Sequence, residues 1–125
     1  MIIKFSNKKA YYKTMEIRYN ENSRIITPLT PRLDELSRSR IFSEISSEEK
    51  NTAINLSFVQ DCTIEFISSL VEFGKKKSLS VFNIPAEIFV LFNVMNIDKI
   101  VQLYVTQEDF EKNSRQLVNR KLAVV

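Results

Sequence analysis

Short apolar runs alternate with helical stripes through the second half of the sequence, and this alternation constrains the fold most strongly. The runs at 52–58 and 79–82 predict buried strands. Between them, Ile64, Ile67 and Leu70 recur at the spacing of a helix that packs one face on a sheet. Strands joined by helices of this length pair in parallel, because the helix returns the chain to the same end of the sheet. We therefore expect an α/β domain.

The flanking segments complete the expected sheet. Met15, Ile17 and Tyr19 alternate with charged residues, which is typical of a half-buried strand, and residues 24–29 predict its hairpin partner. The other expected elements are helices at 33–45, 85–95 and 108–119 and a strand at 100–105. The sequence thus predicts a mixed sheet of four to five strands with an antiparallel edge hairpin and about four helices.

Some side chains can also be assigned to faces or caps. Ile54, Leu56 and Phe58 alternate within their strand and are expected on one face. Asn96 is expected to hold a left-handed helix cap, because Asn tolerates positive φ better than most residues. Phe89 is either an exposed partner contact or the margin of a wide apolar face. Ahead of Asn96 a helical stripe is expected in the core: Ile88, Leu91, Phe92 and Met95.

The composition excludes several function classes. Because the sequence contains no His, it lacks Ser-His and Cys-His nucleophile pairs and His-ligated zinc sites. Its single Gly cannot build a Walker loop or the three-glycine dinucleotide fingerprint. Its single Cys cannot form an internal disulfide, which favours a reducing compartment. We expect a cytoplasmic, non-enzymatic protein with no cofactor and no metal.

Charge and hydropathy indicate neither nucleic-acid binding nor direct membrane insertion. Lys and Arg number 18 against 15 Asp and Glu, a small excess without an evident stripe, so we expect no nucleic-acid partner. The apolar start at 1–5 is soon followed by Lys8 and Lys9, which leaves neither a signal-peptide core nor a spanning segment. We expect one domain at 13–113, an N-terminal extension at 1–12, and the end of the last helix with a tail at 114–125. Residues 1–12 and 121–125 lie outside the pattern of elements, and each is an extra strand, a segment exchanged with a partner, or a mobile terminus.

Three segments, 31–34, 53–63 and 96–101, resemble the STAS family of anti-sigma-factor antagonists, and the resemblance covers roughly 13–113. In that family a strand leads into an Asp-Ser-(Ser/Thr)-Gly turn that opens a helix. A cognate anti-sigma kinase phosphorylates the first Ser. Here Cys62 stands at the position of that Ser, Thr63 at the second hydroxyl position and Ile64 at the Gly. The resemblance implies that this turn is the phosphoacceptor-equivalent site.

Each residue of the turn has more than one interpretation. Asp61 is a helix N-cap or a partner contact. Cys62 is a small buried side chain, or a thiol whose pKa is lowered by the helix dipole and which is open to modification. Asp34, the acid of the family's neighbouring loop, is a partner contact or simply a first-turn acid of the preceding helix.

The resemblance implies a regulatory protein-interaction module. Its expected partner is an anti-sigma factor or a kinase-like regulatory protein, bound through Asp34, Asp61, Cys62 and Thr63. The alternative is a cytoplasmic accessory subunit of an ABC-type transporter, which would contact the transporter ATPase. A homodimer is compatible with either. An enzyme with Cys62 as its nucleophile is disfavoured, since no His is present to activate the thiol.

Overall fold

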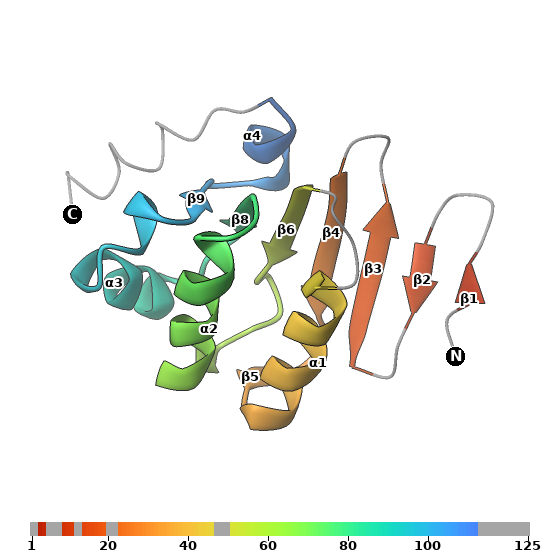
Figure 1. The fold of residues 1–125 in the computed structure, drawn as a ribbon, viewed down its shortest axis with the longest axis horizontal. Coiled ribbons are helices and arrows are strands. Elements are labelled where there is room, and N and C mark those ends of the chain that lie inside the picture. Colours follow the sequence, from red (N-terminus) through yellow and green to blue (C-terminus); the bar gives the residue numbers. More distant parts are fainter. Residues whose placement is uncertain (1–2, 5–8, 12–13, 20–22, 47–50, 113–125) are drawn as a thin grey trace.

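The computed structural model describes residues 3–4, 9–11, 14–19, 23–46 and 51–112 (Figure 1). Among these residues, the main sheet has seven strands in the order β1-β2-β3-β4-β6-β8-β9. The first three pairings are antiparallel, and β4, β6, β8 and β9 run parallel to one another. The predicted α/β class and mixed sheet are confirmed. The strands are β1 (Ile3–Lys4), β2 (Lys9–Tyr11), β3 (Met15–Tyr19), β4 (Ser23–Pro28), β6 (Asn51–Asn55), β8 (Leu79–Phe82) and β9 (Gln102–Leu103).

The antiparallel side of the sheet extends beyond the predicted hairpin. The hairpin forms between β3 and β4, with Ile17 opposite Ile26. However, β3 is not an edge, because β2 pairs with it and β1 pairs with β2. Both added strands lie within the N-terminal extension 1–12, for which an extra strand was one of the expected alternatives.

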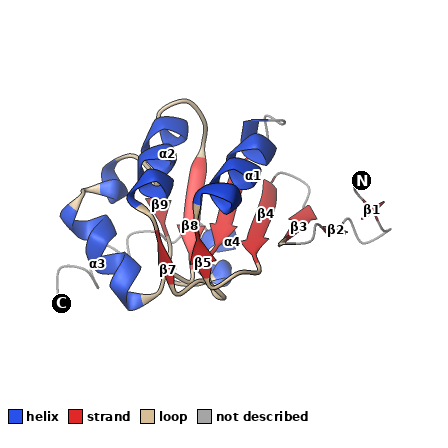
Figure 2. Cartoon of the chain, turned by 90° about the horizontal axis from the view of Figure 1, so that it is seen from below, coloured by secondary structure: helices blue, strands red, loops and turns tan. Residues whose placement is uncertain are grey.

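Within the described residues, four α-helices accompany the sheet, as expected: α1 (Glu35–Ser46), α2 (Ile64–Gly74), α3 (Ala86–Val94) and α4 (Gln107–Lys112). The first two lie side by side on one face of the sheet (Figure 2). Their contact is aromatic, with ring centroids 5.4 Å apart for Phe42 and Phe66 and 5.0 Å apart for Phe42 and Phe73. The expected last helix extended to residue 119; its part from residue 113 onward, with Leu117 and Val118, lies outside the described residues.

The core fills the space between the sheet and its helices. Ile17, Ile26, Ile54 and Val81 from four neighbouring strands are fully buried. Gly74 is the last residue of α2 and packs against the segment before β9. A Cβ atom added there would lie 2.9 Å from Val101 Cγ2 and 3.0 Å from Ile100 Cγ2, both closer than carbon atoms normally approach. The only glycine of the chain therefore serves a close approach of helix and strand layers.

Two predicted buried faces are only half buried. Strand β6 ends at Asn55, three residues earlier than expected, and Phe58 is 59% exposed in the loop that follows. In α3, Ile88 and Phe92 are buried, whereas Leu91 is 37% exposed. The helix packs beside β7 (Asp61–Cys62) and the 3-10 turn η1 (Ile97–Lys99), so other elements cover only a narrow stripe of its surface.

Met95 lies at the end of the same stripe and is also exposed, at 39%. Phe89 is half-buried against the core, which supports its interpretation as the margin of the apolar face. Asn96 has φ of 54° and ψ of 39°, so the predicted left-handed cap is confirmed.

Candidate functional site

A two-stranded parallel ribbon brings the predicted site residues together. Its strands are β5 (Arg32–Leu33) and β7, with Arg32 opposite Asp61 and Leu33 opposite Cys62. The Thr63 N–H donates to the Leu33 carbonyl at 3.2 Å, which extends the pairing by one step. Helix α1 begins two residues after β5, and α2 begins two residues after β7. The ribbon therefore sets the starts of the two helices beside each other (Figure 2).

The residues between ribbon and helices are helix caps. Asp34 Oδ1 accepts a hydrogen bond from the Ser37 backbone N–H at 3.1 Å, and this bond holds the pKa of the Asp34 carboxyl below its ordinary value. Thr63 Oγ1 accepts from the Phe66 N–H at 3.2 Å. Each side chain satisfies a backbone donor that the first helical turn leaves free. The local interpretation of Asp34 as a first-turn acid is therefore corrected by one position: Asp34 caps α1, and Glu35 is the acid of its first turn.

The capping role expected of Asp61 is wrong. Thr63 holds the cap, and Asp61 lies two residues before it, in β7. The Asp61 side chain is 60% exposed and lies 3.9 Å from the Arg32 guanidinium, which is 69% exposed. An ion pair this open to solvent contributes little, about 0–1 kcal/mol, so the Asp61 carboxylate remains open to a partner.

The alternative of a low-pKa thiol is also wrong. Cys62 is half-buried, and its burial together with the charge of Asp61 raises the thiol pKa to about 11. The helix dipole does not compensate, because Cys62 belongs to β7 and lies outside the first turn of α2. A thiol protonated at neutral pH is a poor nucleophile.

Exposed hydrophobic side chains near the ribbon were not recognised from the sequence. Eight large hydrophobic residues are exposed among the described residues, and four of them lie within three residues of β5 or β7 along the chain. They are Leu29 at 44%, Leu36 at 59%, Phe58 at 59% and Ile64 at 55% exposure. We call these four, with Asp34, Asp61, Cys62 and Thr63, the apolar edge.

The helical spacing of Ile64 with Ile67 and Leu70 predicts an inward position for Ile64, whereas the structure exposes it. Ile64 is the first residue after the Thr63 cap and Leu36 the second after the Asp34 cap, and side chains in a first helical turn lean toward the open end of the helix. In the sequence, only the cap-forming residue types at positions 34 and 63 could have indicated that Leu36 and Ile64 lie at helix starts and are exposed.

Arg38 links the helices next to this edge. Its Nη1 donates to Ser69 Oγ of α2 at 3.0 Å, and its Nε donates to Glu35 Oε2 of α1 at 3.0 Å. The guanidinium thereby lowers the pKa of the Glu35 carboxyl. The two helix starts are held in one arrangement, so the apolar edge is a preorganised surface. Within the described residues, no group of His, Cys, Asp and Glu side chains could hold a metal ion.

No protein-family model matches this chain, and the search of curated proteins found no significant match. Among solved structures, the NMR structure of the protein TM1081 is similar, with a TM-score of 0.64 and 18% sequence identity. The similarity covers 84% of this chain and 92% of that chain. At this identity the likeness shows the fold alone. No helix in the described part of the chain is long and apolar enough to cross a membrane.

Proposed function

We propose that this chain is a non-enzymatic regulatory module, similar in kind to the anti-sigma-factor antagonists, that binds a kinase-like regulatory protein in the cytoplasm through its apolar edge. One observation carries the proposal: Leu36 and Ile64, each more than half exposed, lie within two residues of the caps of two helices that start side by side. Single exposed apolar residues are ordinary, but apolar groups gathered at one preorganised place are typical of a protein contact.

The charge of the edge supports regulation by occupancy. Asp61 lies two residues before Thr63, and Asp34 directly follows the Leu33–Cys62 pair on the neighbouring strand, so both already place negative charge near Thr63. A phosphate on the Thr63 hydroxyl would add nearly two further charges and compete with the cap bond to the Phe66 N–H. A partner surface fitted to the unmodified edge would then be repelled. Thr63, rather than the protonated thiol of Cys62, is the residue at which this control would operate.

The test is affinity purification from the native host with the wild-type chain and two edge variants, Leu36→Glu and Ile64→Glu. Both substitutions place an acid in a first helical turn, where the helix dipole favours it, so the variants should fold. We expect the wild type to recover a kinase-like ATPase or its regulator and each variant to lose at least about tenfold of it, as an interface anchor does.

A matched control carries the same substitution away from the edge. Val94→Glu on α3 also replaces an exposed aliphatic residue with an acid, and it should leave recovery of the kinase-like partner unchanged. Recovery of a transporter ATPase would instead favour the accessory-subunit alternative. Equal recovery by wild type and both edge variants would refute the proposed site. Intact-mass measurement of the recovered wild-type chain would show whether phosphate is attached.

A further inference from the structure

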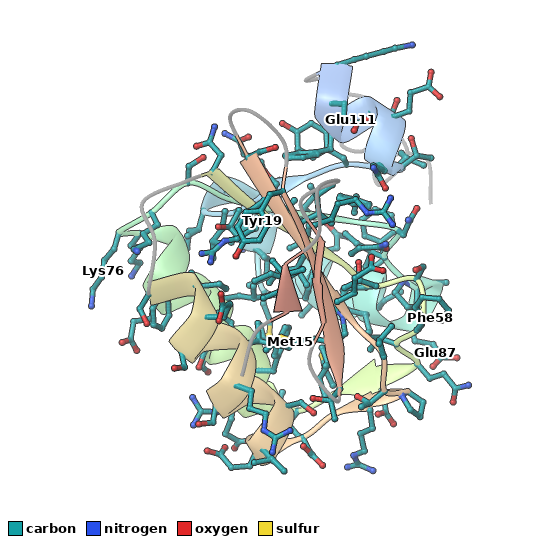
Figure 3. The ribbon with its side chains drawn as sticks, turned by 90° about the vertical axis from the view of Figure 1, so that its right-hand side faces the viewer. Met15, Tyr19, Phe58, Lys76, Glu87 and Glu111 are labelled. Carbon is teal, nitrogen blue, oxygen red and sulfur yellow. The ribbon has the colours of Figure 1, made fainter. Side chains whose placement is uncertain are left out.

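The turn that follows β6 presents an aromatic ring to solvent. Phe58 is the only aromatic residue among the exposed large hydrophobic residues of the described part of the chain. The Val59 N–H donates to the Leu56 carbonyl at 3.0 Å, which closes a four-residue turn with Ser57 and Phe58 at its tip. Leu56 and Val59 are buried, so they take the inward positions and the ring is directed outward. Figure 3 shows Phe58 at the periphery of the molecule, on a different side from Lys76 at the far end of α2.

The half-buried side chain of Asn55 begins this turn. Asn55 Oδ1 accepts from the Ser57 backbone N–H at 3.1 Å, the bond of an Asx-turn, and β6 ends at this residue. The same oxygen accepts from Asn83 Nδ2 at 3.0 Å, and Asn55 Nδ2 donates to Thr27 Oγ1 at 3.3 Å. One side chain therefore bonds to its own turn, to β4 and to the residue after β8. These bonds also explain why the strand stops before Phe58.

The partners of Asn55 are themselves fixed by the sheet. Thr27 is buried in β4, which pairs in parallel with β6. Asn83 directly follows β8, has φ of 54°, and donates its backbone N–H to the Val105 carbonyl at 3.2 Å. The carboxyl ends of β4, β6 and β8 are thus tied together through Asn55. A side-chain network whose members are hydrogen-bonded rigidifies the segments that it joins.

We propose, resting on the function proposed above, that Phe58 is the anchor of the apolar edge and that Asn55 is its positioning residue. Asn55 holds the turn so that the ring meets the kinase-like partner in one arrangement. Aromatic side chains are frequent anchors of protein contacts, and an anchor held in place before binding loses less entropy when it binds. The turn is also joined to the ribbon, because the Gln60 N–H donates to the Pro31 carbonyl at 2.6 Å, directly before β5.

Chymotrypsin cleavage tests the hold on the turn without any partner. The bond between Phe58 and Val59 is cut when the turn opens locally. Asn55→Leu keeps a side chain of similar size and removes all three bonds, each worth about twofold to tenfold in an opening equilibrium. We expect this bond to be cut at least about tenfold faster than in the wild type. Asn83→Gly removes one bond and keeps the left-handed backbone, so it should speed the cut about twofold to tenfold.

Two further variants separate local opening from a general loss of stability. Asn55→Asp should stay within about threefold of the wild-type rate, because a carboxylate can accept hydrogen bonds from all three partners. Gly74→Ala strains the far end of α2 without contact to the turn, so it should leave the rate at this bond unchanged. Wild-type rates in both N55L and N83G would overturn the proposal. So would an acceleration by G74A equal to that by N55L.

Recovery of the kinase-like partner tests the role of the ring. Phe58→Ala should recover at least about tenfold less partner, as expected of an anchor, and equal recovery with the wild type would overturn the proposal. N55L should also recover less partner. If Asn55 acts through the ring, the double variant N55L/F58A should recover as much as F58A alone, whereas losses that multiply would overturn the positioning role.

Failure of the proposed function gives a different result. A wild-type chain that recovers neither a kinase-like ATPase nor its regulator would refute that function. The cleavage rates of N55L, N83G and G74A would then decide by themselves whether Asn55 holds the turn.

Discussion

The Cys62 thiol should be almost unreactive in the folded protein at neutral pH. Its pKa is raised from 9.0 to about 11, first by burial and then by the charge of Asp61. At pH 8 the thiolate fraction should therefore fall about a hundredfold, from about 10% to about 0.1%. A thiolate of higher pKa is intrinsically more nucleophilic, which offsets this loss by up to about tenfold. Alkylation should still be at least about tenfold slower than in the unfolded chain.

Iodoacetamide alkylation followed by intact mass gives a direct measurement, because the sequence contains one Cys. The rate for the folded chain should still be rising at pH 10, whereas the rate for the urea-unfolded chain should level off above about pH 9. The midpoint is the pH at which the alkylation rate of the folded chain reaches half its maximum. Asp61→Asn should lower this folded midpoint but leave it above 9.0, since burial is the larger cause of the raised pKa. A folded midpoint at or below 9.0 would refute this account of Cys62.

The same shift has a consequence for stability. The folded chain holds the Cys62 proton more tightly than the unfolded chain, so this group should destabilise the fold as pH rises from 9.0 through about 11. Urea unfolding at pH 8 and pH 10.5 measures this effect. Between the two pH values, the free energy of unfolding should fall more for the wild type than for Cys62→Ala, which lacks the titrating thiol. Equal losses would contradict the assignment.

Two substitutions test the packing and capping around α2 by thermal and urea unfolding. Gly74→Ala should destabilise the fold by about 1–2 kcal/mol despite the better helix propensity of Ala, because the added methyl would lie 2.9 Å from Val101 Cγ2 and 3.0 Å from Ile100 Cγ2. A neutral or stabilising result would show that the neighbouring side chains move aside without cost. Thr63→Ala should cost about 1 kcal/mol and Thr63→Ser only a few tenths, since Ser keeps the oxygen that accepts the Phe66 N–H; equal losses would contradict the cap.

Much of the fold could be read from the sequence because its signals are local. The strand at 79–82 forms with the expected bounds, and the left-handed conformation at Asn96 was indicated by one residue type in one position. The order of strands and helices follows from hydrophobic periodicity, which a short stretch of chain carries by itself. The site could be located only in part, through the resemblance of the segments around Asp34 and Asp61.

The sequence by itself determined the α/β class, the order of the elements and the residue types at the candidate site. Only the tertiary structure decided that β5 and β7 pair, since two-residue strands have no periodicity to detect. It also decided that Thr63 caps α2, that Cys62 keeps its proton, and that Leu36 and Ile64 are exposed. The physical reason is common to all of these: burial, pKa and exposure depend on which distant segments cover a side chain, and spacing along the chain does not encode that.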